Sequence, residues 1–267
     1  DQGGTGYASK DLIINVPPRT TKSMLVTVMW PVWSWTINPS LSFLTVSYSG
    51  ALATKHARLS RTIIQSDKFR DMFPDAFSIK TDQNVKSHYE NEDGGERYAI
   101  GLGGSATGSG GDIIIVDDPT NPKEAASETE RDNANTNYSE TVYNRTRNPK
   151  TAVRVIIMQR LHENDLTGYL LSKSPDKYYH ICIPSEKGDN VKPETLNEYY
   201  KDGLFWPDRF SPSLLDDYRT ALGSYGYAGQ MLQKPSPPEG GLLKKAWFNI
   251  FTKINEGAAL SVYIDPA

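Results

Sequence analysis

The sequence predicts an α/β fold with a central, mainly parallel sheet flanked by helices. Over about the first two-thirds of the 267 residues, short apolar runs alternate with helical stretches, an order typical of strand–helix–strand units. Two runs, residues 113–116 and 152–158, are continuous and rich in β-branched side chains. Strands buried on both faces of a parallel sheet have this composition.

The first half of the chain supplies the expected elements in a regular order. A strand at residues 12–16 ends at Pro17-Pro18, and apolar residues recur at helical spacing from Lys22 onward. That helical face is made of Met24, Leu25, Val28, Met29 and Val32. A strand at 41–47, a helix at 50–65 and a hairpin at 87–102, turning at Asp93-Gly94-Gly95, are expected next.

The second half begins as α/β and then changes character. After the strand at 113–116, residues 123–145 are polar and helical, and strands are expected at 152–158 and 179–183. Residues 185–233 hold few β runs, many tyrosines and one clear helix at 213–222. Residues 234–241 form a stiff proline segment ending in two glycines, which indicates a domain linker. A last strand at 260–264 would belong to a second domain.

Composition excludes several classes of protein. The chain is 37% apolar and 23% charged, which favours a folded core. Its net charge of −3, from 29 basic and 32 acidic residues, excludes a nonspecific polybasic binder but leaves room for a local positive groove. The single cysteine, Cys182, excludes a disulfide framework and a multi-cysteine zinc site and favours a reducing compartment. No run approaches the roughly 20 apolar residues of a membrane span, and residues 1–10 do not form a signal peptide.

A phosphate-binding loop is expected at residues 16–23, Val-Pro-Pro-Arg-Thr-Thr-Lys-Ser, between a strand and a helix. Unpaired N–H groups and the dipole of the helix N-terminus favour a phosphate there. Lys22 would neutralise the β and γ oxygens, and the Ser23 hydroxyl would bind Mg²⁺. The usual pattern has glycine at its first and sixth positions, which here are Val16 and Thr21. The pattern alone therefore leaves an ordinary basic strand-to-helix turn as an equal alternative.

Two observations favour the phosphate loop. Arg19 places a second cation inside it, and Asp117-Asp118 closes the buried strand at 113–116. Asp117 would bind the magnesium shell, and Asp118 would polarise the attacking water. By itself, Asp-Asp-Pro could simply cap the strand and start a turn.

Together these segments resemble the large terminase subunit of tailed bacteriophages, the ATP-driven motor and nuclease that packages DNA. The resemblance covers nearly the whole chain, and its proline-arginine form of the phosphate loop is typical of that family. It is carried by residues 12–23 (LIINVPPRTTKS), 47–49 (SYS), 101–108 (GLGGSATG), 113–119 (IIIVDDP), 160–168 (RLHENDLTG), 227–230 (YAGQ) with 235–241, and 263–267 (YIDPA).

The resemblance implies a domain organisation. Residues 1–184 would be a P-loop ATPase core of the ASCE type, without the adenine-binding segment that normally precedes the loop. Residues 185–233 would be the small lid subdomain, and residues 234–243 the linker. Residues 244–267 would begin an RNase H-like nuclease domain whose remaining carboxylates lie outside this sequence.

The resemblance also assigns residues to an ATP and Mg²⁺ site. Arg19 would contact the γ-phosphate, and Gln159, at a position often held by threonine, would contact the nucleotide or its attacking water. The segment that follows Gln159 looks like the motif that couples hydrolysis to movement. Asp265 would be the first nuclease carboxylate, for Mg²⁺ or Mn²⁺, although one carboxylate cannot hold two metals. The nucleotide would be bound by Pro18, Arg19, Thr20, Thr21, Lys22 and Ser23, and the catalytic magnesium by Ser23 and Asp117.

Two departures from the family pattern bear on mechanism. The acid after the magnesium aspartate is the short Asp118 where glutamate is frequent. Ser109 stands between Gly108 and Gly110, where the family often has an arginine that acts on a neighbouring subunit's ATP. Arg97, Arg145 and Arg160 are unranked candidates for that arginine.

As a terminase, the chain would work with double-stranded DNA, the small terminase subunit and the portal protein, as a homo-oligomeric ring in the host bacterial cytoplasm and with no membrane. Two alternatives remain open. The chain could be a decayed, non-catalytic assembly module, or mainly the scaffold of an endonuclease, which would need further acids near Asp265.

Other polar and aromatic residues have simpler explanations than a site. Asn164 or Asp165 is expected to cap a helix rather than to join His162 and Glu163 in a metal site. Lys244-Lys245 could contact DNA phosphate or form a solvated face. Trp30, Trp33 and Trp35 are expected to pack in the core or at a helix end, and Cys182 to be buried.

Overall fold

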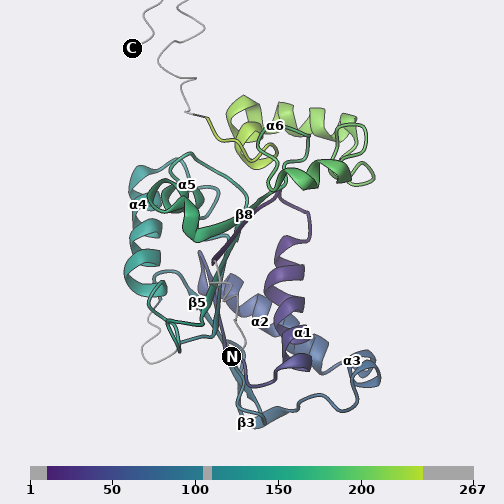
Figure 1. Ribbon diagram of the computed structural model, residues 1–267, viewed down its shortest axis with the longest axis vertical. Coiled ribbons are helices and arrows are strands. Elements are labelled where there is room, and N and C mark those ends of the chain that lie inside the picture. Colours follow the sequence, from purple (N-terminus) through teal and green to yellow (C-terminus); the bar gives the residue numbers. More distant parts are fainter. Residues whose placement is uncertain (1–10, 105–109, 237–267) are drawn as a thin grey trace, which may run out of the picture. The chain divides into compact units, whose positions relative to one another are not determined.

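A computed structural model of the chain describes residues 11–104 and 110–236, and in these residues eight strands form one sheet (Figure 1). The strand order is β3-β4-β5-β2-β6-β7-β1-β8. From β5 to β8 all neighbours are parallel, while β4 pairs antiparallel with both β3 and β5. The predicted mainly parallel α/β fold is therefore confirmed. The strands are β1 (Asp11–Asn15), β2 (Phe43–Ser47), β3 (Ile79–Val85), β4 (His88–Asn91), β5 (Glu96–Gly101), β6 (Ile113–Asp117), β7 (Val153–Met158) and β8 (Tyr178–Cys182).

Helices cover both faces of the sheet (Figure 1). On one face lie α1 (Trp30–Ile37), which continues the π-helical segment η1 (Met24–Met29), together with α2 (Gly50–Ile64) and α3 (Asp67–Met72). On the other lie α4 (Glu128–Asn137), extended by the π-helical η2 (Tyr138–Val142), and α5 (Leu166–Lys173). Two apolar clusters, one on each face, fix these layers. The short 3₁₀ segments are η3 (Pro175–Lys177) and η4 (Glu194–Tyr199).

The predicted apolar face of the first helix is only partly buried. Val28 and Val32 are 0% and 4% exposed, whereas Leu25 and Met29 are 55% and 47% exposed. The prediction assumed a period of 3.6 residues, but this segment begins as a π-helix, whose hydrogen bonds span five residues. The tryptophans of this segment also differ in exposure: Trp35 is buried in the core, whereas Trp33 is 55% exposed.

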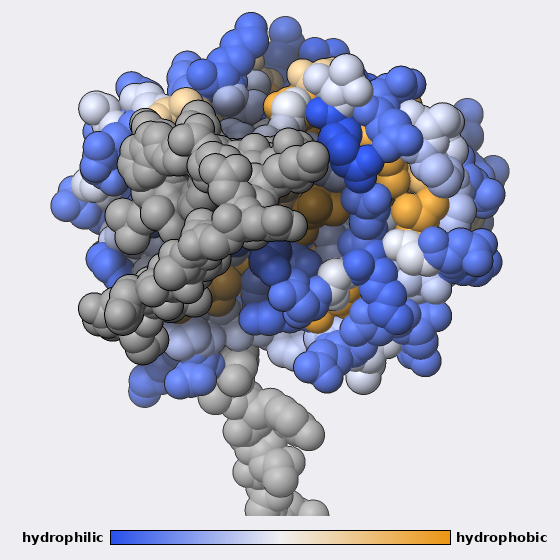
Figure 2. Space-filling view, turned by 90° about the horizontal axis from the view of Figure 1, so that it is seen from above, coloured by the Kyte–Doolittle hydropathy of each residue, from blue (hydrophilic) through white to orange (hydrophobic). Residues whose placement is uncertain are grey.

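Residues 185–233 have an apolar cluster of their own. Their main helix, α6 (Pro212–Gln230), is longer than predicted, because Gly223 adopts a left-handed conformation with φ of 66° and lets the chain continue after a kink. The cluster comprises Leu204, Phe210, Leu215, Tyr227 and Met231. Figure 2 views the molecule from the end where α6 lies, and the surface of the described residues that is visible there is mostly hydrophilic. The five side chains of the cluster are buried against one another, whereas Tyr199 of the same segment is 62% exposed.

Candidate active site

The sheet order brings three chain segments to one edge. Strands β6, β7 and β1 are parallel neighbours, so their carboxyl ends lie side by side. In register, Asp117 at the end of β6 pairs with Ile157, and Asn15 at the end of β1 pairs with Met158. The loop at 16–23, the pair Asp117-Asp118 and Gln159 therefore meet at this edge, where open parallel sheets bind their ligands.

The loop at 16–23 has a left-handed backbone at two positions although it contains no glycine. Arg19 and Thr21 have φ values of 65° and 61°, in the left-handed region that disfavours residues with a Cβ atom. Thr21 stands where the usual pattern has its second glycine, and its φ is one that glycine adopts without strain. The Thr20 hydroxyl donates to the Pro17 carbonyl over 2.8 Å and closes the turn. Strained, non-glycine backbone of this kind concentrates at functional sites.

Lys22 joins the loop to both acids. Its Nζ forms an ion pair with Asp118 and lies 3.6 Å from Asp117 Oδ1, and the residue is 9% exposed. Burial raises the pKa of Asp118 above its usual range, while the charge of Lys22 and a hydrogen bond from the Gln159 backbone oppose that shift.

Asp117 is fully buried and holds its carboxylate against hydroxyl groups. Ser23 Oγ donates to Oδ1 over 3.0 Å, and Thr27 Oγ1 donates to Oδ2 over 2.7 Å. A hydroxyl and a carboxylate oxygen in contact are ligands that Mg²⁺ prefers. The residues present therefore fit a magnesium ion between Ser23 and Asp117.

A cavity of about 270 Å³ opens beside these groups. Gln159 lines it and is 7% exposed, and its Oε1 has no hydrogen-bond partner. A buried polar atom without a partner is costly and indicates a ligand or water that would satisfy it. Arg19 also lines the cavity and is exposed. The lining residues are Pro18, Arg19, Thr21, Lys22, Ser23, Met24, Asp118 and Gln159.

Most of the predicted site residues are thus brought together. Asp117 lies just behind the cavity, and Thr20 turns its hydroxyl into the loop instead. Asp265 and Lys244-Lys245 lie outside the described residues, as do Ser109 and the linker and nuclease segments beyond residue 236. Sequence reasoning missed Thr27, although its position four residues after Ser23 places both on one helical face.

The three candidate arginines differ in accessibility. Arg97 is 1% exposed inside the sheet and cannot extend to a neighbouring molecule. Arg160 is held by both carboxylate oxygens of Asp165 at 3.0 Å. Arg145 is half-buried at the end of the segment after η2, and no hydrogen bond or ion pair joins its side chain to the described part of the chain.

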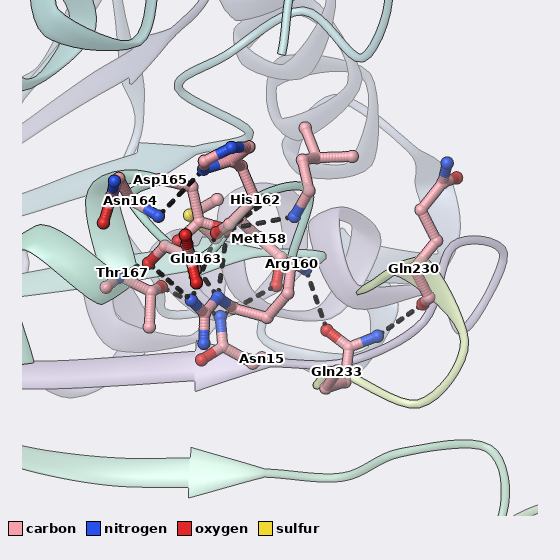
Figure 3. A network of polar contacts seen from close by, with 12 residues as sticks. Asn15, Met158, Arg160, His162, Glu163, Asn164, Asp165, Thr167, Gln230 and Gln233 are labelled. Carbon is pink, nitrogen blue, oxygen red and sulfur yellow. Dashed lines mark hydrogen bonds and ion pairs between the residues drawn. The ribbon is translucent and has the colours of Figure 1, made fainter. Parts of the chain in front are cut away.

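The segment after Gln159 is built around Asp165 (Figure 3). Its side chain accepts from the Gly168 N–H over 3.0 Å and caps α5, which confirms the predicted cap. His162 Nδ1 accepts from the Asn164 N–H over 3.0 Å. Gln233, 2% exposed, accepts from the Arg160 N–H over 3.0 Å and donates to the Gln230 carbonyl. This segment therefore connects the carboxyl edge of the sheet to residues 185–233.

Two other features lie apart from this edge. A larger cavity of about 690 Å³ is lined almost entirely by apolar side chains of η1 and α1 to α3. His88, Glu90 and Glu96 place possible metal ligands within 4.8 Å of one another. Lys80 pairs with Glu90 at 2.8 Å and Arg147 with Glu96 at 3.2 Å, so these charges are already balanced within the chain.

No protein-family model matches the sequence, and no curated protein matches it significantly. Solved structures do match. The large terminase of bacteriophage HK97 has 12% sequence identity and a TM-score of 0.53 over 85% of this chain and 47% of its own. An arginine-to-alanine mutant of the Thermus phage P74-26 large terminase ATPase domain has 13% identity and a TM-score of 0.53 over 85% of this chain and 90% of its own.

The chain spans about half (47%) of the HK97 protein but nearly all (90%) of the P74-26 ATPase domain. At identities this low, the similarity extends to the architecture alone, an eight-stranded, mainly parallel sheet in the described residues. The chain therefore has the fold of the ATPase domain of phage large terminases.

Proposed function

We propose that this chain is the ATP-hydrolysing motor part of a phage large terminase, which drives double-stranded DNA into a procapsid. The observation that carries the proposal is the contact of Ser23 with Asp117 beside a cavity lined by Lys22, Arg19 and Gln159. ATP hydrolysis requires ligands for magnesium and positive charge for the phosphates. Ser23 and Asp117 offer a hydroxyl and a carboxylate for the ion, Lys22 and Arg19 offer two cations, and Gln159 offers an unpaired amide oxygen.

The triphosphate would bind along the loop at residues 18–23. Lys22 and Arg19 supply positive charge, and N–H groups at the start of η1 supply donors. Ser23 and Asp117 would hold Mg²⁺, which, when bound, neutralises charge on the phosphate oxygens.

Asp118 is proposed to orient the attacking water. Its carboxylate is paired with Lys22 in the structure, so it is not yet available as a base. A phosphate that draws Lys22 toward itself would break this pair and release the Asp118 carboxylate, which makes activation depend on occupancy of the site. Gln159, whose backbone bonds to Asp118, would present its unpaired Oε1 to the same space.

The movement is proposed to pass through the segment after Gln159. Arg160 and Asp165 hold this segment to α5, and Gln233 ties it to the end of residues 185–233, which we propose act as a lid. A shift of Gln159 on hydrolysis would be transmitted through these bonds.

The remaining assignments are part of the same proposal. Residues 1–184 form the ATPase core, 234–243 a linker and 244–267 the start of a nuclease domain in which Asp265 binds Mg²⁺ or Mn²⁺. The small terminase subunit, the portal protein and further copies in a ring are the expected partners, in the host cytoplasm. Arg145, which is half-buried and whose side chain has no hydrogen bond or ion pair within the described residues, is the candidate to act between copies. No helix in the described part of the chain is long and apolar enough to cross a membrane.

The test is Mg²⁺-dependent release of phosphate from ATP. We expect Lys22→Ala and Asp117→Ala each to lower the turnover by at least about 10²-fold, the typical effect of removing one group that stabilises the transition-state charge. Lys177→Ala removes a lysine from an ion cluster at the opposite end of the strands and should leave turnover unchanged. If the parent chain hydrolyses no ATP, or both site variants match it, the proposal fails; nucleotide binding without hydrolysis would favour a non-catalytic assembly module.

A further inference from the structure

Both oxygens of the Asp117 carboxylate are engaged by one helical segment. Ser23 donates to Oδ1 and Thr27, four residues later, donates to Oδ2, at 3.0 Å and 2.7 Å. Ser23 borders the cavity, whereas Thr27 is 0% exposed and lies on the side of the carboxylate away from it. A carboxylate bound at one oxygen can still rotate about its Cβ–Cγ bond. Two bonds to opposite oxygens fix that rotation.

Thr27 is itself held in place from behind. Arg97, 1% exposed on β5, donates from Nη2 to the Thr27 carbonyl over 2.5 Å. The next residue is also fixed, because the Ser60 hydroxyl of α2 donates to the Val28 carbonyl over 2.9 Å. His56, also on α2, places Nδ1 3.4 Å from Asp117 Oδ2. The rear of the carboxylate is thus enclosed by β5 and α2.

We propose that Thr27 is a positioning residue for the magnesium site: its hydroxyl holds Asp117 so that Oδ1 faces Ser23 and the cavity. This inference rests on the proposed function, because it concerns the same ion. Without the Thr27 hydroxyl, Oδ2 would lose its shortest partner and the carboxylate would turn. The N–H donors and cations of the loop, which bind phosphate directly, would be unaffected.

The experiment compares nucleotide binding with and without the ion. A fluorescent ADP analogue is titrated into the full chain in excess EDTA and then at increasing Mg²⁺ concentrations. The variants are Thr27→Val, Thr27→Ala, Thr27→Ser and, as a control, Thr45→Val. Thr45 is also 0% exposed and its hydroxyl has no partner, so this control removes a buried threonine hydroxyl that does not contact Asp117.

Mg²⁺ should increase the affinity for the nucleotide, and we expect Thr27→Val to raise the Mg²⁺ concentration that gives half of this increase by about 10-fold or more. That is the usual cost of losing a partner of a metal ligand. Affinity in EDTA should stay at the parental value. Thr27→Ser, which keeps the hydroxyl, should respond to Mg²⁺ like the parent, and Thr27→Ala like the valine variant. The serine–alanine pair gives the same comparison if Thr27→Val does not fold.

The proposal is overturned if Thr27→Val and Thr45→Val respond alike, or if the serine and alanine variants are equally impaired. It is also overturned if all Thr27 variants lose affinity in EDTA, since that indicates a general structural role. A parent chain that binds Mg²⁺-nucleotide but does not turn it over would refute the proposed function without removing this test.

Discussion

Clusters of charged side chains lie at both ends of the neighbouring strands β6, β7 and β1, and the two clusters differ in whether polar groups beside them lack a partner. At the amino ends, Asp11 meets Arg154 at 3.3 Å and Lys177 at 3.6 Å. Both cations also contact the ring of Tyr143: its centroid lies 4.1 Å from the guanidinium carbon of Arg154 and 4.2 Å from Lys177 Nζ. At the carboxyl ends, Lys22 meets Asp117 and Asp118.

The amino-end cluster is saturated by its own chain. The Arg154 side chain bonds to both oxygens of Asp11 and to the Tyr143 carbonyl. The carboxyl-end cluster borders a cavity, has left-handed backbone at Thr21 and leaves Gln159 Oε1 unpaired. A buried ion pair alone is thus no sign of a site. Strain, space and an unpaired polar atom beside the pair are what distinguish one.

The largest difference between the two ends is expected in catalysis. Asp118→Asn should lower the ATP turnover about 10²- to 10⁴-fold, the usual contribution of a positioned base, and should leave nucleotide affinity nearly intact. Asp11→Asn, the matched change at the amino ends, should leave the turnover of the folded protein at the parental value. Steady-state phosphate release and nucleotide titration measure both. Equal rates for Asp118→Asn and the parent would remove Asp118 from the mechanism.

The effects on stability should have the opposite order, with the amino-end cluster contributing more than the carboxyl-end cluster. Arg154→Ala leaves Asp11, 2% exposed, with only Lys177 at 3.6 Å as a charge partner, and it is expected to lower the free energy of unfolding by about 3 kcal/mol, the lower end of the usual cost of breaking a buried pair. Lys22→Ala should cost less, because the side chain of Asp118 is 24% exposed and the other partner, the buried Asp117, keeps its hydrogen bonds from Ser23 and Thr27. Urea denaturation at neutral pH gives both values. If Lys22→Ala proves the more damaging of the two, the division between a structural and a functional cluster is wrong.

A pH effect should come from His180 of β8, next to the carboxyl end of β1. Its Nε2 lies 2.8 Å from Asn15 Oδ1, and burial lowers the pKa of His180 from 6.5 to about 4. The unfolded chain then binds the proton more tightly than the folded one. This contribution to stability is complete above pH 6.5 and is lost as the pH falls toward 4.

The loss should amount to about 2–3 kcal/mol after allowance for partial exposure. Thermal denaturation between pH 4 and 7 measures it. His180→Gln cannot take up the proton and should flatten the profile. A parent and a variant with parallel profiles would show that another group is responsible.

The smallest effect is expected from relieving the strain in the loop. Thr21→Gly removes the Cβ atom from a left-handed position and should raise the free energy of unfolding by about 1 kcal/mol. Thr20→Gly is the matched control and should destabilise, because it removes the hydrogen bond to the Pro17 carbonyl. Urea midpoints distinguish the two. A destabilised Thr21→Gly would mean that the threonine side chain, not the backbone, is required there.

The strongest patterns in the sequence predicted most of the sheet. The continuous apolar runs that became β6 and β7 could be recognised because strands buried on both faces need no alternation. β3 is largely polar, and α3 is only six residues long, so neither gave a periodic signal. The helix expected at 123–145 begins at Glu128, because Ser127 caps it and the preceding residues form turns.

The site was predictable as a set of residue types but not as a geometry. Lys22, Ser23 and Asp117 could be recognised as candidates, because a lysine, a hydroxyl and a carboxylate that follow strands are the groups that a phosphate and magnesium site would need. The left-handed backbone of Thr21 could not be predicted, because the glycine that would indicate it is absent. The burial of Arg97 could not be predicted either, because arginine is usually exposed unless it is paired, and the sequence does not show which group pairs with it. The contact between Thr27 and Asp117 could not be predicted, because Asp117 belongs to β6, and only the folded structure shows that β6 lies next to the helical segment of Thr27.

The most direct test of the central claim is a crystal structure with a non-hydrolysable ATP analogue and Mg²⁺. We predict the phosphates along residues 18–23, the ion between Ser23 and Asp117, and Lys22 moved from Asp118 to the phosphates. Phosphates bound at any other place on the chain, with Lys22 still paired to Asp118, would contradict the account.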